Sequence, residues 1–290
     1  MARKLRGTDP KQAKQSKPKI LVFGAPGVGK TWAALDFPSV YYIDCEGGAN
    51  LPHYTDKLKR SGGLYLGPQD GANDFATVTE EIITLATTQH KYRTVVIDSY
   101  SKIFNTQVAL EYQRMEDAKR DMEKTFGAEK KVAINWTRKW LVWFEKLDLN
   151  VILICHEKDK WTNGAVTGQT YDGWDKLEYE LHLALRVTKQ GTSRKAKVTK
   201  TRLEGFTDGA TFDWSYATFA EMFGRDVIEA DAVPVLPVTP EQIAEYQGML
   251  DVIKVDAKVL EKWGAVDLED LAHDDLQRRI DYLKKLKEGN

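Results

Sequence analysis

Apolar and polar positions along this chain alternate between two kinds of segment. Short continuous apolar runs, typical of strands buried on both faces of a parallel sheet, occur at 20–23, 40–43, 94–97 and 151–155. The longer segments between them repeat apolar residues at helical spacing. Because strands and helices alternate in this order, the pattern predicts an α/β fold with a mostly parallel sheet.

Three segments carry helical signals. Asn73 or Asp74 can cap a helix whose apolar side chains share one face; they are Phe75, Val78, Ile82, Leu85 and Ala86. Residues 105–131 predict a polar helix that is interrupted near Gly127. The third segment is an aromatic stripe made of Trp136, Trp140, Trp143, Phe144 and Leu147. The stripe suits either a platform for unpaired bases or a core helix packed on the sheet, and we favour the core helix.

The pattern changes after the last of these strands. Segments 181–188 and 195–202 alternate apolar and polar residues and are joined through Gln190-Gly191-Thr192, which predicts an antiparallel hairpin. A strand at 210–214 and a short helix ending at Phe223 follow.

The same pattern divides the chain into four parts. Residues 1–19 are basic, with Asp9 as the acid, and predict a disordered arm. The arm either has no role or contacts the phosphate backbone of a nucleic acid. The core spans 20–230, and the proline-containing segment 231–238 reads as a linker. Residues 239–290 predict a small helical domain that opens with a capping box at Thr239-Pro240-Glu241-Gln242. Acids outnumber bases in this domain, which favours protein contact over DNA contact.

Composition narrows the function classes. The net charge of −1 over 290 residues gives no overall field for nucleic acid, so any such surface must be local. The cysteines, Cys45 and Cys155, do not have metal-ligand spacing and are expected to be buried thiols in a reducing compartment. Since no apolar run is long enough to span a membrane, and the polar N-terminus lacks a signal-peptide core, a soluble, cytoplasmic protein without a membrane partner is expected.

The first strand runs directly into a glycine-rich loop, G-A-P-G-V-G-K-T. Its residues are Gly24, Ala25, Pro26, Gly27, Val28, Gly29, Lys30 and Thr31. Glycines at this spacing let backbone N–H groups turn inward around phosphate oxygens, and the following helix adds its positive end. Lys30 is expected to neutralise the outer phosphates and Thr31 to ligate Mg²⁺. The loop therefore predicts nucleoside triphosphate binding, with ATP and Mg²⁺ as cofactors.

Polar residues follow three other strands, where the carboxyl ends of a parallel sheet place ligands. Glu46 is a candidate for orienting or deprotonating the water that attacks the γ-phosphate. The alternative is that Glu46 is an ordinary exposed glutamate of the loop. Asp98 ends a strand of Walker B form and is the candidate metal-side carboxylate. His156 is placed to hydrogen-bond the γ-phosphate, a contact that exists with ATP and vanishes with ADP; its alternative is a structural role.

Two basic segments are candidates for nucleic-acid contact. Residues 157–176 predict a long loop that contains Lys158, Lys160 and Trp161. The loop either binds single-stranded nucleic acid or is an ordinary flexible insertion. The predicted hairpin carries basic residues that include Arg194, Lys195, Lys197, Lys200 and Arg202. They form either a charged edge that blocks aggregation or a phosphate-binding surface.

In this order, the motifs resemble the RecA-type recombinase core over roughly residues 20–225. The motifs are G-A-P-G-V-G-K-T, I-D-C-E-G-G, V-V-I-D-S, C-H-E-K and K-V-T-K-T-R. More narrowly, the chain is similar to phage-encoded RecA-like ATPases, including ATP-dependent single-strand annealing proteins. The resemblance implies that Glu46 is the catalytic carboxylate, that Asp98 is the Walker B acid, and that His156 stands where recombinases usually have Gln.

The resemblance also implies that Lys200 and Arg202 reach the ATP of a neighbouring subunit. The resulting hypothesis is an ATPase that assembles head to tail as a ring or filament on single-stranded DNA and is stimulated by it. A single-strand-binding or replication protein is a candidate partner of the terminal domain. Two alternatives are a P-loop kinase of a small molecule and a regulatory ATPase scaffold, such as a replication loader or defence component.

Overall fold

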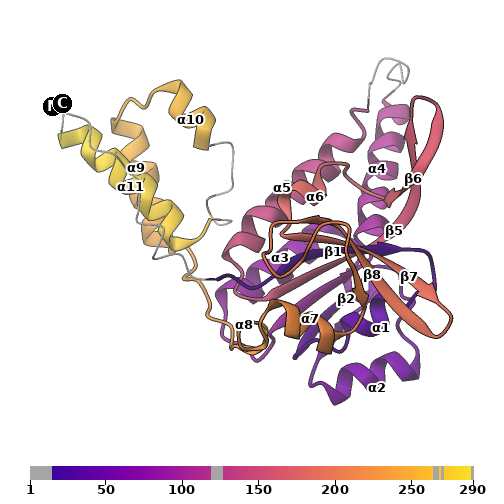
Figure 1. The fold of residues 1–290 in the computed structure, drawn as a ribbon. Helices are drawn as coiled ribbons and strands as arrows, with labels where there is room; N and C mark the ends of the chain where they lie inside the picture. Colours follow the sequence, from indigo (N-terminus) through magenta and orange to yellow (C-terminus); the bar gives the residue numbers. More distant parts are fainter. Residues whose placement is uncertain (1–14, 119–126, 264–267, 269–270, 289–290) are drawn as a thin grey trace.

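A central sheet organises the protein, whose computed structural model describes residues 15–118, 127–263, 268 and 271–288 (Figure 1). The strands are β1 (Lys19–Gly24), β2 (Val40–Asp44), β3 (Leu64–Leu66), β4 (Thr94–Asp98), β5 (Asn150–Thr162), β6 (Ala165–Tyr171), β7 (Leu183–Gln190), β8 (Ser193–Thr201) and β9 (Thr211–Asp213). Their order across the sheet is β3-β2-β4-β5-β1-β7-β8-β9, and β6 pairs with β5 outside this path. Strands from β3 to β7 in this order are parallel, whereas β8 and β9 pair antiparallel, so the predicted fold class is confirmed.

The sheet register brings the candidate residues to one edge. Gly24 at the end of β1 lies opposite His156 on β5. Asp44 at the end of β2 lies opposite Asp98 at the end of β4. Strand β5 separates β1 from β4, so the phosphate loop and the Walker B acid approach the same space from either side of the strand that carries His156.

Helices cover both faces of the sheet (Figure 1). They are α1 (Lys30–Ala34), α2 (Pro52–Arg60), the 3₁₀ helix η2 (Pro68–Asp70), α3 (Phe75–Thr87), α4 (Tyr100–Asp117), α5 (Lys130–Lys146), α6 (Leu177–Glu180), α7 (Tyr216–Phe223) and α8 (Arg225–Glu229). Helices α3, α4 and α5 share one apolar core with the sheet, and α1, α7 and α8 share the other. Trp140, Trp143 and Phe144 are buried in the first core, so the core-helix interpretation of the aromatic stripe is confirmed.

The segment after His156 is a β-ribbon, and the prediction of a long loop over 157–176 is wrong. Strand β5 continues past the sheet to Thr162, turns through Asn163 and Gly164, and pairs with β6. The ribbon is exposed over most of its length. Strands that bury neither face need no apolar alternation, and the sequence pattern therefore missed them.

The prediction of a disordered arm over residues 1–19 is wrong at its C-terminal end. Lys17 and Lys19 are buried, and β1 begins at Lys19. The Lys19 ammonium donates hydrogen bonds to the carbonyls of Leu147 (2.7 Å) and Leu149 (2.5 Å), and burial lowers its pKa to about 7. The other basic residues of the predicted arm, at positions 3, 4, 6, 11 and 14, lie outside the described residues.

The C-terminal segment contains α9 (Pro240–Val252), α10 (Ala257–Trp263) and α11 (His273–Glu288) with an apolar core of their own. The Thr239–Gln242 capping box is present, as predicted. Residues 231–238 are not free of the core, because Val235 donates a backbone hydrogen bond to Ala86 on α3 (2.8 Å). An ion pair between Lys146 on α5 and Asp275 on α11 joins the two parts.

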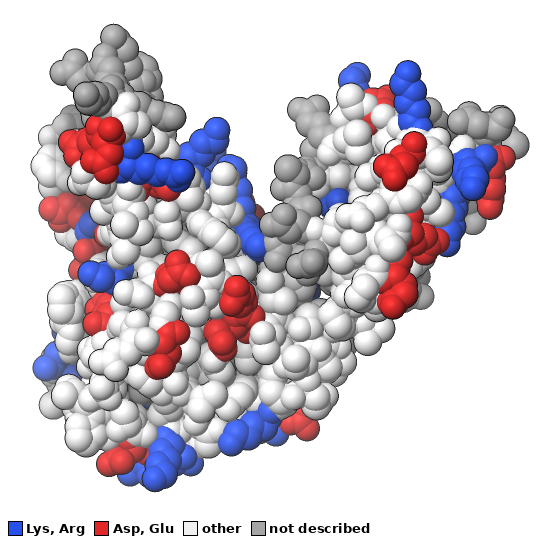
Figure 2. Space-filling model, turned by 180° about the vertical axis from the view of Figure 1, so that it is seen from behind, with Lys and Arg blue, Asp and Glu red and all other residues white. Residues whose placement is uncertain are grey.

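The face shown in Figure 2 carries acidic and basic side chains interspersed on both parts, without a continuous basic area among the described residues. None of the helices in the described part of the chain is long and apolar enough to cross a membrane.

Candidate functional site

The phosphate loop joins β1 to α1 in the way the sequence predicts. Gly27 and Gly29 have φ values of 73° and 91°, a left-handed conformation that side-chain-bearing residues rarely adopt. The Lys30 ammonium folds back and donates hydrogen bonds to the carbonyls of Gly24 (2.7 Å) and Ala25 (3.0 Å). Burial lowers the pKa of Lys30, while nearby Asp98 opposes that shift. The loop thus places a cation inside the curve where a polyphosphate would lie.

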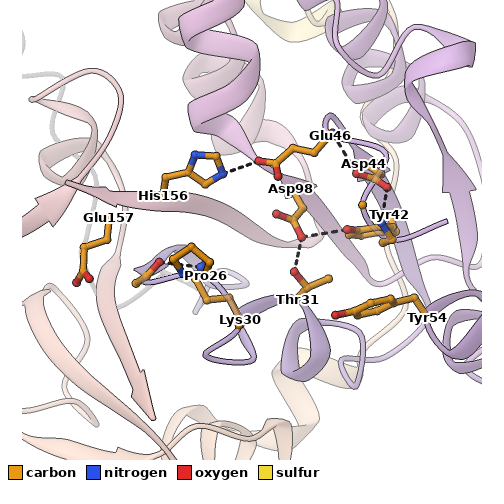
Figure 3. A pocket seen from close by; sticks show the side chains of 14 residues that line it. Pro26, Lys30, Thr31, Tyr42, Asp44, Glu46, Tyr54, Asp98, His156 and Glu157 are labelled. Atoms are coloured by element: carbon orange, nitrogen blue, oxygen red, sulfur yellow. Dashed lines mark hydrogen bonds and ion pairs between the residues drawn. The ribbon is translucent and has the colours of Figure 1, made fainter. Parts of the chain in front are cut away.

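A pocket of about 580 Å³ opens above this loop (Figure 3). Its lining residues are Gly24, Pro26, Gly27, Lys30, Thr31, Tyr42, Asp44, Glu46, Gly48, Ala49, Tyr54, Asp98, His156 and Glu157. Part of the predicted loop and all three predicted polar residues therefore meet in one space. Its volume is within the range of sites for small molecules and cofactors.

Asp98 and Thr31, the two predicted metal-side residues, lie together on one side of the pocket. The Thr31 hydroxyl donates to an Asp98 oxygen at 2.5 Å, and the Tyr42 hydroxyl donates to the same oxygen at 3.0 Å. Burial raises the pKa of Asp98 to about 6. A hydroxyl beside a carboxylate fits Mg²⁺, which prefers oxygen ligands. Among the described residues, no cluster of three or more His, Cys, Asp or Glu could hold a metal ion.

Glu46 and His156 contact each other directly in the pocket (Figure 3). His156 Nε2 and Glu46 Oε1 are 2.6 Å apart, and the Ser99 hydroxyl also donates to Glu46. The hydrogen bond from His156 lowers the pKa of Glu46, and the same bond raises the pKa of His156. Glu46 is therefore a carboxylate at neutral pH, which a general base requires.

Asp44 holds the loop that carries Glu46. Its carboxylate accepts hydrogen bonds from the backbone N–H groups of Glu46 (3.1 Å), Gly47 (2.8 Å) and Ala49 (3.0 Å). The Tyr65 hydroxyl donates to the same side chain at 3.0 Å. These bonds fix the direction in which Glu46 leaves the end of β2.

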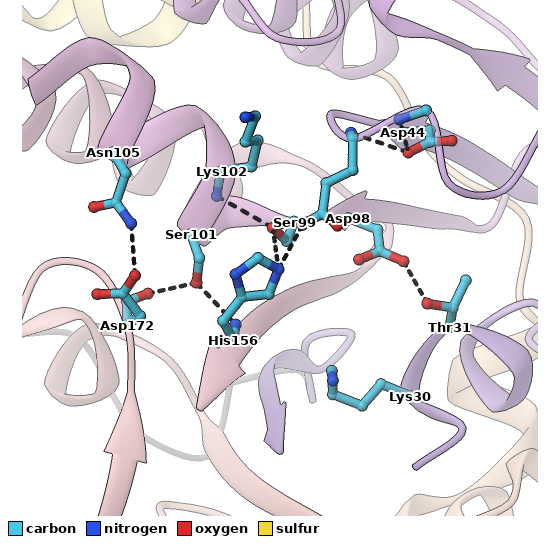
Figure 4. A network of polar contacts seen from close by, with 12 residues as sticks. Lys30, Thr31, Asp44, Asp98, Ser99, Ser101, Lys102, Asn105, His156 and Asp172 are labelled. Atoms are coloured by element: carbon cyan, nitrogen blue, oxygen red, sulfur yellow. Dashed lines mark hydrogen bonds and ion pairs between the residues drawn. The ribbon is translucent and has the colours of Figure 1, made fainter. Parts of the chain in front are cut away.

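The backbone of His156 is tied to α4 and to the ribbon. Its N–H donates to the Ser101 hydroxyl (2.9 Å), which in turn donates to the Asp172 carbonyl (2.6 Å) (Figure 4). The Asp172 N–H closes the circuit by donating to the His156 carbonyl at 2.9 Å. A displacement at His156 would therefore reach the base of the β5–β6 ribbon.

The sequence analysis missed an aromatic group beside the pocket. Tyr54 lines the pocket, with Trp32 5.7 Å and His53 4.4 Å from its ring centroid. The Lys57 ammonium lies 3.9 Å from the centre of the Trp32 ring. An aromatic face next to a phosphate loop suits stacking on a nucleobase. The available signal was Trp32 directly after Thr31 together with two rings soon after Glu46.

Lys200 and Arg202 lie away from this pocket. Lys200 is level with Leu21 of β1 through Ala184, and Arg202 is level with Lys19 through His182. At strand spacing, these positions are about 10 and 16 Å before Gly24 along β1. Lys200 donates to the Leu181 carbonyl and Arg202 to the Tyr179 carbonyl, and burial lowers the pKa of Lys200 to about 8.

The six candidate nucleic-acid residues fall into two ribbons that project from the carboxyl edge of the sheet (Figure 1). On β5, Lys158 approaches Asp172 (3.5 Å) and Asp175 (3.6 Å), whereas Lys160 and Trp161 are exposed. On β8, Lys197 is exposed and Lys195 pairs with Asp213 (2.8 Å).

Arg194 lies against the phosphate loop. A Cβ placed on Gly29 would be 2.9 Å from its Nε. The six residues therefore do not form one surface.

The glycine-rich loop with Lys30 and Thr31 shares its pocket with Asp98 at the end of β4 and with the Glu46 carboxylate, an arrangement typical of a P-loop ATPase. A model of the AAA domain matches residues 16–203, well over half of the 290 residues. The chain therefore belongs to the AAA domain family.

Two solved structures are similar to the chain. The RadB recombinase has 18% identity and a TM-score of 0.41, and the match covers 68% of this chain and 86% of that one. A KaiC-like protein from Pyrococcus horikoshii OT3 has 15% identity and a TM-score of 0.41, covering 68% and 84%. A search of curated proteins found no match.

Proposed function

We propose that this protein is an ATP-dependent, single-stranded-DNA-binding protein that promotes strand annealing or pairing, in phage recombination or replication. One observation carries the proposal: His156, which faces the pocket, and the exposed ribbon belong to the same strand, β5. A ligand above the phosphate loop that contacts His156 would therefore act on the residue directly before the ribbon.

The ribbon suits a single strand better than a duplex. Trp161 is 64% exposed and is neighboured by Lys160, which offers a ring for base stacking and a cation for the backbone. Base stacking of this kind contributes about 1–3 kcal/mol per base and requires bases that are not paired.

The site supports a simple hydrolytic cycle. Without nucleotide, His156 is bonded to Glu46. A γ-phosphate is a stronger acceptor for His156, and its arrival would leave the Glu46 carboxylate free to orient and deprotonate water. Bound Mg²⁺ would neutralise phosphate charge. Loss of the γ-phosphate returns His156 to Glu46, and the ribbon to its starting position.

Assembly of copies head to tail completes the site. The positions of Lys200 and Arg202 support a role in trans, since they lie well before the end of β1 and therefore at a distance from their own phosphate loop. In a heterologous contact each copy presents one surface and receives the other, which generates a ring or a filament. The C-terminal domain would remain available for a single-strand-binding or replication protein.

The proposal is tested by ATP turnover at several protein concentrations, with and without a single-stranded oligonucleotide. Turnover is expected to rise with both and to fall at least about a hundredfold in Lys30→Ala and Glu46→Gln, since they remove transition-state charge stabilisation and the base. Arg225→Ala, in an exposed pair with Glu229 on α8, is the control. Turnover that is unaffected by DNA and by protein concentration at low salt would contradict the proposal.

A further inference from the structure

An ion pair that has no place in the cycle above lies at the edge of the pocket, beside the phosphate loop, and one of its two residues lines the pocket. Arg186 Nε on β7 donates to Glu157 Oε1 on β5 at 2.6 Å. The Glu157 side chain is 14% exposed and lines the pocket, and the Arg186 side chain is 34% exposed. Figure 3 shows Glu157 on the Pro26 side of the pocket, opposite Asp44 and Tyr54.

The pair spans the end of β1. Strands β5 and β7 flank β1, whose last residue, Gly24, lies opposite His156. Glu157 is one residue further along β5, and Arg186 lies opposite Phe23. The two side chains therefore bridge the neighbouring strands at the point where β1 gives way to the phosphate loop.

His156 and Glu157 together anchor the start of the ribbon. Successive side chains of a strand point to opposite faces. His156 is bonded to Glu46, whereas Glu157 is bonded to Arg186. His156, directly before the ribbon, and Glu157, its first residue, are thus each held by a charged partner on a different strand or loop.

A carboxylate lining a phosphate pocket has an electrostatic consequence. Glu157 is close enough to Lys30 to counteract the lowering of the lysine pKa. A bound polyphosphate would be repelled by Glu157 and attracted by Arg186. A phosphate also accepts two parallel hydrogen bonds from a guanidinium while carrying more charge than a carboxylate.

We propose that Arg186 is a second sensor of the terminal phosphate, which it binds in exchange for Glu157, and that this exchange frees the base of the β5–β6 ribbon. The inference rests on the proposed function for nucleotide binding at the phosphate loop, and it does not depend on DNA. With ADP bound, the Arg186–Glu157 ion pair remains intact and the base of the ribbon stays anchored. The exchange therefore discriminates triphosphate from diphosphate.

The test is calorimetric titration of the full chain with Mg²⁺ and either ATPγS or ADP, in the absence of DNA. Arg186→Ala is expected to weaken ATPγS binding by about tenfold or more, the value of a lost charge-assisted bond, with a smaller change for ADP. Glu157→Gln removes the competitor and the repulsion at nearly constant shape, and is expected to strengthen ATPγS binding severalfold. Arg186→Lys should fall between wild type and Arg186→Ala, since lysine keeps the charge but loses the fork.

Opposite signs for the two substitutions are the signature of the exchange. A pair that serves only folding would weaken both nucleotides in both variants, and that result overturns the inference. Equal effects of Arg186→Ala on ATPγS and ADP also overturn it. Arg225→Ala is the control for loss of an exposed arginine. Wild-type protein that binds neither nucleotide would refute the proposed function instead, so the two failures are distinct.

Discussion

The buried carboxylate of Asp98 gives a prediction in which stability and activity move in opposite directions. Burial raises the pKa of Asp98 from 3.8 to about 6. Its negative charge is therefore more costly in the folded protein than in the unfolded chain. Asp98→Asn removes that charge and leaves an oxygen that can still accept from Thr31 and Tyr42.

The magnitude follows from the shift in pKa. A change of about 2 units corresponds to at most about 3 kcal/mol. For an acid whose folded pKa is raised, the folded state binds the proton more tightly, so the cost is complete above pH 6 and disappears as the pH falls from 6 to below 4. Asp98→Asn should therefore be more stable than wild type by up to about 3 kcal/mol at pH 8, by about half as much at pH 5, and by little at pH 3.5.

Urea denaturation of both proteins at these pH values, with a chelator and without nucleotide, measures this difference. The same variant should have lost Mg²⁺-dependent ATP turnover at pH 8. The reasoning fails if Asp98→Asn is less stable than wild type at pH 8, or if the difference between the proteins does not shrink on acidification.

The remaining predictions concern stacking on the nucleobase, packing of the apolar core and the ATP site shared between copies. Tyr54→Ala should weaken ATP and ADP binding equally, by about tenfold as expected for one lost stacking contact, while exposed Tyr112→Ala should not; a change confined to ATP would contradict base stacking. Trp140 is 1% exposed and donates a hydrogen bond to the Thr79 hydroxyl (2.7 Å). Trp140→Ala should lower the free energy of unfolding by about 3–5 kcal/mol. Val142→Ala on the same helix, at a position 50% exposed, should cost less than about 1 kcal/mol, and equal losses would contradict the packing described. Mixing Arg202→Ala protein with Glu46→Gln protein should restore part of the ATP turnover, because some interfaces then join an intact Arg202 on one copy to an intact Glu46 on the next. No recovery at any ratio would argue against a site shared between copies.

The elements that could be predicted from the sequence are those with a strong apolar pattern or a motif. Strands β1, β2 and β4 are built on continuous apolar runs. Strand β1 ends at Gly24 and β4 at Asp98, both predicted site residues, and β2 ends two residues before the predicted Glu46. Because parallel strands end at one edge, the expectation that Glu46, Asp98 and His156 meet followed from the parallel direction of their strands, without knowledge of the strand order.

Other features depend on contacts between distant residues. The β5–β6 ribbon buries neither face over much of its length, so neither helical nor strand periodicity marks it. Lys17 and Lys19 looked like part of a solvated arm, yet the Lys19 ammonium is satisfied by two carbonyls that follow α5. The Arg186–Glu157 pair joins residues whose proximity depends on β5 and β7 flanking β1, an order that the local pattern does not contain.

The central claim is that the bound nucleotide, ATP or ADP, controls the affinity of the β5–β6 ribbon for single-stranded DNA. Fluorescence anisotropy of a labelled single-stranded oligonucleotide, titrated with the full chain in low salt, measures it directly. The account predicts binding with ATPγS that is about tenfold or more tighter than with ADP, and loss of this difference in Trp161→Ala. Equal affinity in the two nucleotide states, or no binding to the oligonucleotide in either, would contradict it.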